Sequence, residues 1–125
     1  MKFSNVRYRS ICDGNVISFN RPCSFSKRGF ISRVTFSNDS VNFNLTFSNE
    51  RLLVKADGEV AYSLTLVEGL SSPYVVSFSG GSFDAEVLCK KLNVSQNDDK
   101  ILIDCEYQTN VSNCSQFFVV SIIIS

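Results

Sequence analysis

Residues 41–67 alternate between apolar and polar side chains more regularly than the rest of the chain. In the runs 41–47 and 60–66 every second residue, beginning with Val41 and Val60, is apolar or aromatic. Side chains of a strand point alternately to its two faces, so each run gathers these groups on one face. Between the runs, residues 51–56 lead into Asp57-Gly58, a dipeptide typical of type I′ turns. The stretch predicts three consecutive antiparallel strands with one apolar face.

Shorter runs of the same kind recur along the whole chain. They are separated by Gly, Pro, Asn, Asp and Ser about every 8–12 residues, and no segment has convincing helical periodicity. A length of 125 residues fits one domain. The sequence therefore predicts a single all-β domain spanning residues 1–125. We expect an antiparallel β-sandwich or jelly roll of about ten short strands, with little or no helix.

The chain contains no histidine, which removes the commonest general base and the commonest metal ligand. Paired carboxylates such as Asp84 and Glu86 lie on predicted strands, where a solvated outer face is the expected position. We predict no catalytic residues, no metal site and no cofactor. No run of 18 apolar residues occurs, so no membrane-spanning segment is predicted.

Charge is divided unevenly along the sequence. Residues 1–38 carry seven basic residues and one acidic residue, whereas residues 39–125 carry five basic and eleven acidic residues. The favoured interpretation is that strands of opposite charge lie side by side in one sheet, so that their charges compensate each other. The alternative is a polyanion partner, either nucleic acid or a sulfated glycan, because Tyr8, Phe25 and Phe30 lie among basic residues. The candidate ligand-binding residues are Arg7, Arg9, Lys27, Arg28 and Arg33.

Five cysteines form an odd set, so at least one is unpaired within the chain. Their spacing suggests two local, loop-closing disulfides, Cys12–Cys23 and Cys105–Cys114, with Cys89 as the free thiol. The other interpretation is a reducing compartment in which all five are thiols.

Five Asn-x-Ser/Thr sequences occur, where composition alone predicts about two. This excess favours a secreted protein or one on an extracellular surface, and the alternative is a cytoplasmic or virion location. The candidate glycosylation sites are Asn38, Asn44, Asn93, Asn110 and Asn113.

The spacing of Cys23 and Cys89 is similar to that of the inter-sheet cysteine pair in immunoglobulin domains. However, no tryptophan lies between them, and Val87 replaces the tyrosine expected two residues before the second cysteine. We assign the chain to no family on this comparison.

The leading functional hypothesis is a non-enzymatic recognition module at a cell or virion surface. It would bind a protein or glycan partner through loops at residues 24–29, 71–74 and 93–99, because loops on rigid β scaffolds often carry function. The alternatives are a structural subunit of a capsid or coat, and the polyanion-binding protein described above. The oligomeric state is not predicted.

Overall fold

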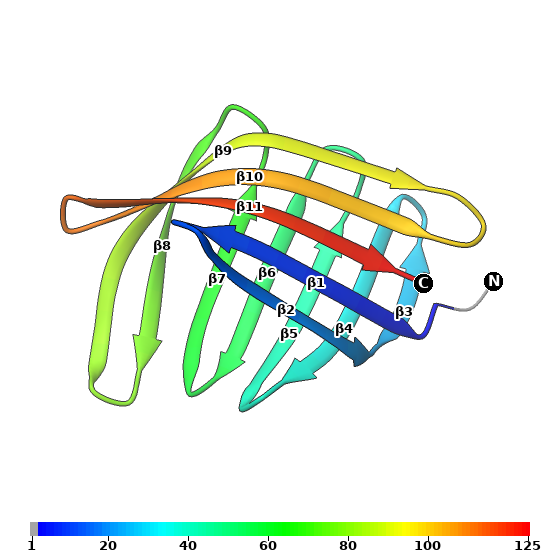
Figure 1. The fold of residues 1–125 in the computed structure, drawn as a ribbon, viewed down its shortest axis with the longest axis horizontal. Coiled ribbons are helices and arrows are strands. Elements are labelled where there is room, and N and C mark those ends of the chain that lie inside the picture. Colours follow the sequence, from blue (N-terminus) through cyan, green and yellow to red (C-terminus); the bar gives the residue numbers. More distant parts are fainter. Residues whose placement is uncertain (1–2) are drawn as a thin grey trace.

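The computed structural model describes residues 3–125, which form eleven β-strands and no helix (Figure 1). Each strand is antiparallel to the neighbours with which it pairs. The strands are β1 (Asn5–Cys12), β2 (Asn15–Pro22), β3 (Ser24–Arg28), β4 (Ile31–Asn38), β5 (Val41–Phe47), β6 (Leu52–Gly58), β7 (Val60–Leu66), β8 (Ser71–Phe78), β9 (Gly81–Gln96), β10 (Ile101–Val111) and β11 (Cys114–Ile124).

All eleven strands belong to one sheet, in the order β2-β1-β11-β10-β9-β8-β7-β6-β5-β4-β3. From β3 to β11 each strand pairs with the next one in sequence, and β1 then pairs with β11. The two strands at the ends of the order, β2 and β3, are separated in sequence by Cys23 alone. The sheet therefore closes on itself into a nearly complete barrel (Figure 1).

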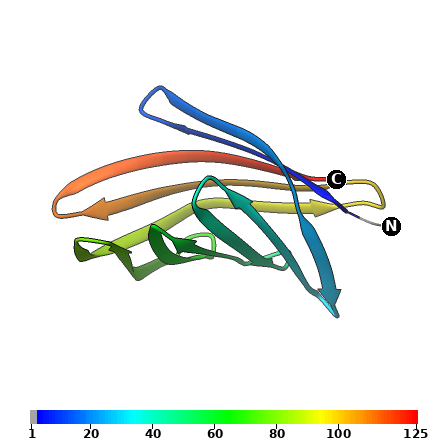
Figure 2. The ribbon, with the colours of Figure 1, turned by 90° about the horizontal axis from the view of Figure 1, so that it is seen from below.

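The barrel is flattened, so that two parts of its wall face each other (Figure 2). Strand β9 pairs with β8 along its first half and with β10 along most of its length. Its register with β10 shifts between Glu106 and Tyr107, opposite Lys90. An extra residue of this kind bends a strand and increases its twist, which allows β9 to pass from one part of the wall to the other.

The all-β antiparallel prediction is confirmed, but the β-sandwich or jelly roll is not. A sandwich has two separate sheets. Here, backbone pairing continues through all eleven strands, from β2 at one end of the sheet order to β3 at the other. Alternation of side chains specifies which face of a strand is buried. It does not specify whether two facing layers are joined at their edges, and long strands such as β9 and the pair β2–β3 join them here.

The core fills the inside of the barrel with the inward-facing rows of its strands. On β4, Ser32, Val34 and Phe36 are buried while the residues between them are exposed, and Ile101, Ile103 and Cys105 form the same pattern on β10. Burying one side chain of this size contributes about 1.5–3 kcal/mol. These rows therefore hold the strands in their observed register, because a shift of one residue would expose a whole row.

Three segments predicted as contact loops are mainly strand. Residues 24–28 form β3, residues 71–74 begin β8, and residues 93–96 end β9.

Pro22 ends β2 as its missing N–H group suggests, but the next residues pair with β4 instead of leaving the sheet. Pro73 lies in the part of β8 that extends beyond its two-residue pairing with β7.

The predicted meander over residues 41–67 is confirmed as β5, β6 and β7, but Gly58 has a different role from the one expected. It pairs with Val41 on β5 and is not the centre of a tight turn. A Cβ atom at this position would lie 2.2 Å from the backbone oxygen of Ser40, and the φ of Gly58 is +157°. Glycine is required because two backbones approach closely.

We predict that Gly58→Ala lowers the free energy of unfolding by about 3 kcal/mol, because the backbone at Ser40 must move to admit a methyl group. The matched control is Gly69→Ala, where φ is +84° and no described atom lies within 4 Å of the added Cβ. Its expected cost is about 1–2 kcal/mol, which is the cost of a left-handed backbone alone. Urea denaturation measures both values, and equal losses would contradict the steric explanation.

Candidate functional site

The barrel encloses a cavity of about 220 Å³, which we call the lumen. Its residues come from β1, β2, β4, β5, β6, β7, β10 and β11, so it lies in the centre of the fold. Several inward-facing side chains, including Phe43, Val54 and Tyr62, are only half-buried because they border this space. The aliphatic part of the lining is Ile17, Leu45, Leu52, Val54, Leu64, Leu66, Val120 and Ile122.

Four aromatic rings form a continuous row along one side of the lumen. Tyr8 stacks on Phe19 with ring centroids 4.8 Å apart, Phe19 lies 5.9 Å from Phe36, and Phe36 stacks on Phe43 at 5.2 Å. The row runs from β1 through β2 to β4 and β5. In the described part of the chain no backbone ladder joins β2 to β4. The contact between Phe19 and Phe36 therefore spans a slit in the barrel wall with side chains alone.

Tyrosine hydroxyls give the lumen a small polar component. Tyr8, Tyr62 and Tyr107 all line it. Burial, followed by the nearby Tyr62, raises the pKa of Tyr8 to about 12. Burial also raises the pKa of Tyr62, and it raises that of Tyr107 well above the usual value. These hydroxyls therefore stay protonated near neutral pH and act as uncharged hydrogen-bonding groups.

Asn38 contributes an amide at the slit end of the lumen. It continues the inward row of Val34 and Phe36 on β4. Its Oδ1 atom is buried and has no hydrogen-bond partner among residues 3–125. Most buried side-chain polar atoms in folded proteins are hydrogen-bonded, so this acceptor is an exception within the described residues.

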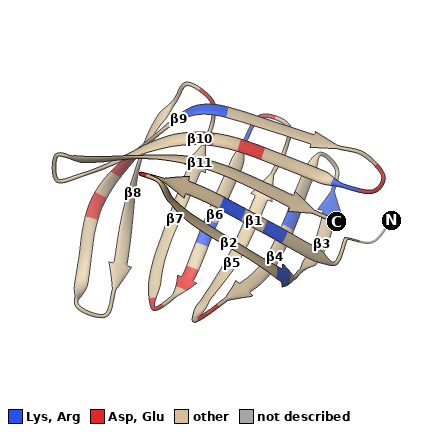
Figure 3. Cartoon of the chain, in the orientation of Figure 1, with Lys and Arg blue, Asp and Glu red and all other residues tan. Residues whose placement is uncertain are grey.

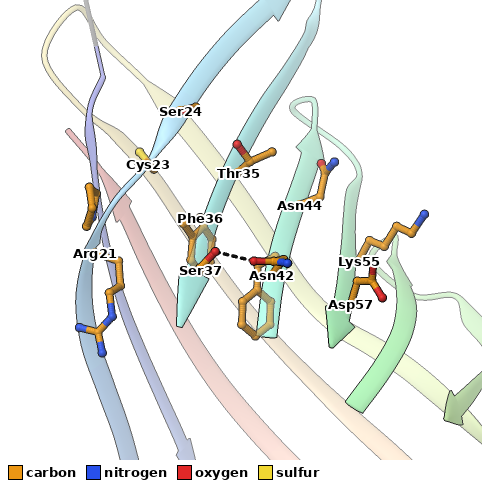
Figure 4. A pocket seen from close by; sticks show the side chains of 12 residues that line it. Arg21, Cys23, Ser24, Thr35, Phe36, Ser37, Asn42, Asn44, Lys55 and Asp57 are labelled. Carbon is orange, nitrogen blue, oxygen red and sulfur yellow. Dashed lines mark hydrogen bonds between the residues drawn. The ribbon is translucent and has the colours of Figure 1, made fainter. Parts of the chain in front are cut away.

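A wider, polar groove of about 730 Å³ lies on the outside of the slit, and it shares Phe36 and Phe43 with the lumen (Figure 4). Its walls include the outward side chains Ser37 and Asn42, which are joined by a 2.6 Å hydrogen bond. Arg21 lies at its edge, with its guanidinium carbon 5.7 Å from the centre of the Phe19 ring. The groove is a solvated approach to the lumen, whereas the enclosed, apolar space inside is the better candidate for specific binding.

The predicted basic residues fall into two groups. Arg7 and Arg9 are exposed on the outer face of β1, whereas Lys27, Arg28 and Arg33 belong to the β3–β4 hairpin (Figure 3). Arg33 donates a 3.3 Å hydrogen bond from Nε to Oδ1 of Asn44. Strands β1 and β3 lie in different parts of the wall, so the two groups do not form one patch (Figure 2).

Two of the three aromatic residues of these basic segments point into the barrel, whereas Phe30 in the β3–β4 connection is 92 % exposed. Tyr8 lines the lumen, and Phe25 packs against Phe3 with ring centroids 4.8 Å apart. Because neighbouring residues of a strand face opposite sides, Arg7 and Arg9 point outward while Tyr8 points inward. Lys27 shares the strand face of Phe25, but it is exposed near the end of the β3–β4 hairpin. The interleaved aromatic and basic surface that the sequence suggested is therefore not formed by Tyr8 or Phe25, and a polyanion partner stays a prediction.

All five cysteines are free, so the predicted pairs Cys12–Cys23 and Cys105–Cys114 are wrong in this structure. Cys105 pairs with Val120, whereas Cys114 pairs with Val111, six positions further along β10. That separation is about 20 Å, far beyond the reach of a disulfide. Cys12 and Cys23 likewise lie at opposite ends of the β1–β2 hairpin. Cys89 is free, as expected, but it shares this state with the other four.

The candidate glycosylation sites differ in their surroundings. Asn93 and Asn113 are exposed, whereas Asn38 faces the lumen. Asn44 accepts hydrogen bonds from Arg33 and Thr46. Oδ1 of Asn110 accepts hydrogen bonds from Gln108 and Ser115. Glycosylation itself stays a prediction at each site.

The lumen was not predicted from the sequence, although a signal for it exists. Tyr8, Tyr62 and Tyr107 occupy inward positions within mainly apolar alternating rows, which also include the buried Ser10 and Thr109. Polar atoms at such positions need a partner or an open space beside them. The pattern identifies the strands that contribute polar groups to the interior, but it does not reveal that these side chains meet around one cavity.

Neither a scan against protein-family models nor a search of the curated proteins finds a match for this chain. Among solved structures, the chain is similar to the crystal structure of the YwiB protein from Bacillus subtilis, with a TM-score of 0.86 and 19 % sequence identity. The similarity covers 99 % of this chain and 91 % of that one. At this identity it shows the fold alone. Within residues 3–125 the chain forms no helix that could cross a membrane.

We predict that denatured protein, prepared without reductant, takes up five alkylating groups as counted by intact mass. In the native state Cys114 should react first because it is exposed, whereas Cys89 and Cys105 should react only on unfolding. Burial, followed by Cys89, also raises the pKa of Cys105 to about 12, which keeps its thiol protonated. Fewer than five groups without reductant would reveal a disulfide and contradict this structure.

We predict that stability falls between about pH 10 and pH 12. The unfolded chain loses the Tyr8 proton near pH 10, whereas the folded chain keeps it up to about pH 12. Below pH 10 both the folded and the unfolded chain hold the proton, so Tyr8 does not lower the free energy of unfolding. Above it the free energy of unfolding decreases, by about 3 kcal/mol for a shift of this size. Urea midpoints across this range measure the effect, and Tyr8→Phe should flatten the slope. An equally steep slope in that variant would contradict the assignment to Tyr8.

Proposed function

We propose that this chain is a non-enzymatic binding protein that holds one small, uncharged and mainly apolar molecule inside its barrel. The observation that carries the proposal is the composition of the lumen. Rings and aliphatic side chains surround the space, and within residues 3–125 no Asp, Glu, Lys or Arg lines it. Apolar pockets with a few well-placed polar groups are typical of small-molecule sites.

The size of the lumen limits the ligand. An apolar cavity of roughly 150 Å³ is sufficient to hold benzene, and sites for drug-sized ligands usually measure roughly 300–1,000 Å³. At about 220 Å³ the lumen fits a molecule of one or two fused rings, or a short branched hydrocarbon group. The stacked rings of Phe36 and Phe43 favour a flat ligand, because aromatic groups pack well in offset-stacked or edge-to-face arrangements.

The slit between β2 and β4 supplies an approach to this space. Ile17 on β2 lines the lumen and is nevertheless 61 % exposed, so the mouth lies beside it. The polar groove outside the slit shares Phe36 and Phe43 with the lumen. A ligand entering from the groove would therefore pass between aromatic rings and would not need to break a backbone ladder.

Binding without catalysis is supported by the chemistry of the lining. Cys105 is the thiol nearest to the site, and its raised pKa keeps it in the protonated, weakly nucleophilic form. The chain has no histidine that could act as its general base. The proposal keeps the binding role that the sequence suggested but moves the ligand from the loops to the interior. A surface location and a protein or glycan partner stay predictions.

We predict that Val54→Phe weakens binding of a small aromatic probe such as naphthalene by at least tenfold. Val54 is central to the lumen, between Leu45 and Leu64 in the sheet, and a ring at this position would occupy the ligand's space. Because the chain has no tryptophan, tyrosine fluorescence reports binding directly. Circular dichroism verifies that the variant keeps its β structure.

The matched control is Leu53→Phe, which adds a ring on the outward face of the same strand and should leave binding unchanged. If both variants bound the probe equally well, the binding site would have to lie outside the lumen. Failure of the unmodified protein to bind small apolar probes at their solubility limits would refute the proposed function itself.

A further inference from the structure

The two edge strands of the sheet differ in how well they are protected against pairing with another chain. β3 has five residues and carries Lys27 and Arg28, and short, charged edges of this kind resist pairing. β2 has eight residues, with no charged residue from Gly14 to Asn20, and within residues 3–125 it pairs with β1 alone. Because antiparallel pairs alternate in their hydrogen bonding, about half of the backbone N–H and C=O groups of β2 point away from β1. These groups are available to another strand.

The half of β2 next to the β1–β2 turn also exposes apolar side chains. Val16 is 53 % exposed and Ile17 is 61 % exposed, and every residue from Asp13 to Ser18 is exposed. In Figure 2 this end of the hairpin projects away from the rest of the wall. Neighbouring side chains of a strand face opposite sides, so Val16 and Ile17 place apolar groups on both faces of the edge. An uncharged, apolar edge of this kind favours pairing with a further strand.

The sequence of this hairpin is complementary to itself in an antiparallel pair. When Ile17 lies opposite Ile17 of a second copy, Val16 lies opposite Ser18, and Asp13 lies beside Arg21. Opposed residues in this register differ by an even number of positions, so each pair shares one face of the joined sheet. Opposite charges placed across from each other stabilise a strand pair. A two-fold axis at Ile17 repeats the pair of Asp13 and Arg21 on both sides.

The outer groove offers room for the turn of the second copy. Its volume is about 730 Å³, and Arg21 lies at its edge (Figure 4). The lining contains two basic residues, Arg21 and Lys55, and one acidic residue, Asp57. Asp13, at the β1–β2 turn, is the one acidic residue among residues 1–38. The charge of the turn therefore complements the charge of the groove that it would enter.

We infer that the free edge of β2 binds β2 of a second copy of this chain, antiparallel and about a two-fold axis at Ile17. This inference goes beyond the proposed function and does not depend on it. One strand pair is small beside the roughly 1,200–2,000 Å² that stable interfaces bury, so the dimer is weak and its population depends on concentration. Because Ile17 also lies at the mouth of the lumen, the dimer covers that mouth, and entry through the slit belongs to the separate chain.

The test is sedimentation of the full chain at concentrations up to about 1 mM, where monomer should convert to dimer. Ile17→Lys places two ammonium groups across from each other at the axis and should raise the dissociation constant of the dimer by about tenfold or more. Circular dichroism verifies the fold of the variant. The matched control is Val119→Lys, at a 41 % exposed position on the outer face of β11, which should leave the dissociation constant unchanged.

A mixture of variants tests the register. Ile17→Glu alone should be as weakly associated as Ile17→Lys, because equal charges again meet at the axis. When the two variants are mixed, opposite charges meet there and the heterodimer should form. A mixture that stays monomeric would contradict an axis at Ile17.

A milder variant, Asp13→Asn, leaves the edge itself intact. Asn tolerates the positive φ of this position, which is +51°, so the turn is kept while the charge is removed. The dissociation constant should rise by about two- to fivefold at low salt, as expected for one exposed ion pair. An unmodified chain that remains monomeric at every concentration would overturn the inference. So would a dimer that Ile17→Lys leaves unchanged, or an open-ended series of larger species in place of a dimer.

Discussion

The change of pairing partner at Pro22-Cys23 determines the shape of this molecule. β2 pairs with β1, and one residue later β3 pairs with β4, so a single stretch of chain joins the two ends of the sheet. Because the partners differ, β2 and the end of β4 separate and leave a slit. At one end of the slit, the chain itself connects β2 to β3 and closes the barrel. Further along the slit, only the rings of Phe19 and Phe36 bridge it. The lumen, its mouth and the outer groove all follow from this arrangement.

Much of the fold follows from local pattern, whereas the site depends on contacts between distant segments. Alternation around Val34 and Leu45 identified inward positions correctly, because burial of one strand face requires only period two. The sequence suggests Cys105 and Cys114 as a local pair because they are only nine positions apart, yet the long β10–β11 hairpin holds them far apart. The sequence suggests Asn38 as a glycan acceptor. The alternation of β4 places it in the same row as Val34 and Phe36. The cavity beside it is formed by strands from the whole barrel, so the local sequence does not predict it.

The distribution of polar groups separates two environments. Charged side chains such as Arg9, Arg33 and Lys55 lie on outer faces, in contact with water. The lining of the lumen includes three tyrosines and Cys105, and one buried amide oxygen, that of Asn38, has no hydrogen-bond partner among the described residues. Interactions inside such an apolar space are stronger than in water, and unpaired groups are correspondingly costly. In the proposed binding role, a few neutral polar atoms would therefore provide selectivity that a larger charged surface would provide only weakly.

The slit has a consequence for the rate at which molecules exchange with the interior. In a fully closed barrel, a guest can leave only through an end of the cylinder or by local unfolding of a strand. Here the described residues place only side chains across the gap between β2 and β4. Rotation of a ring is far faster than rupture of a backbone ladder. Guests should therefore be released and replaced while every strand pairing, and with it the native state, persists.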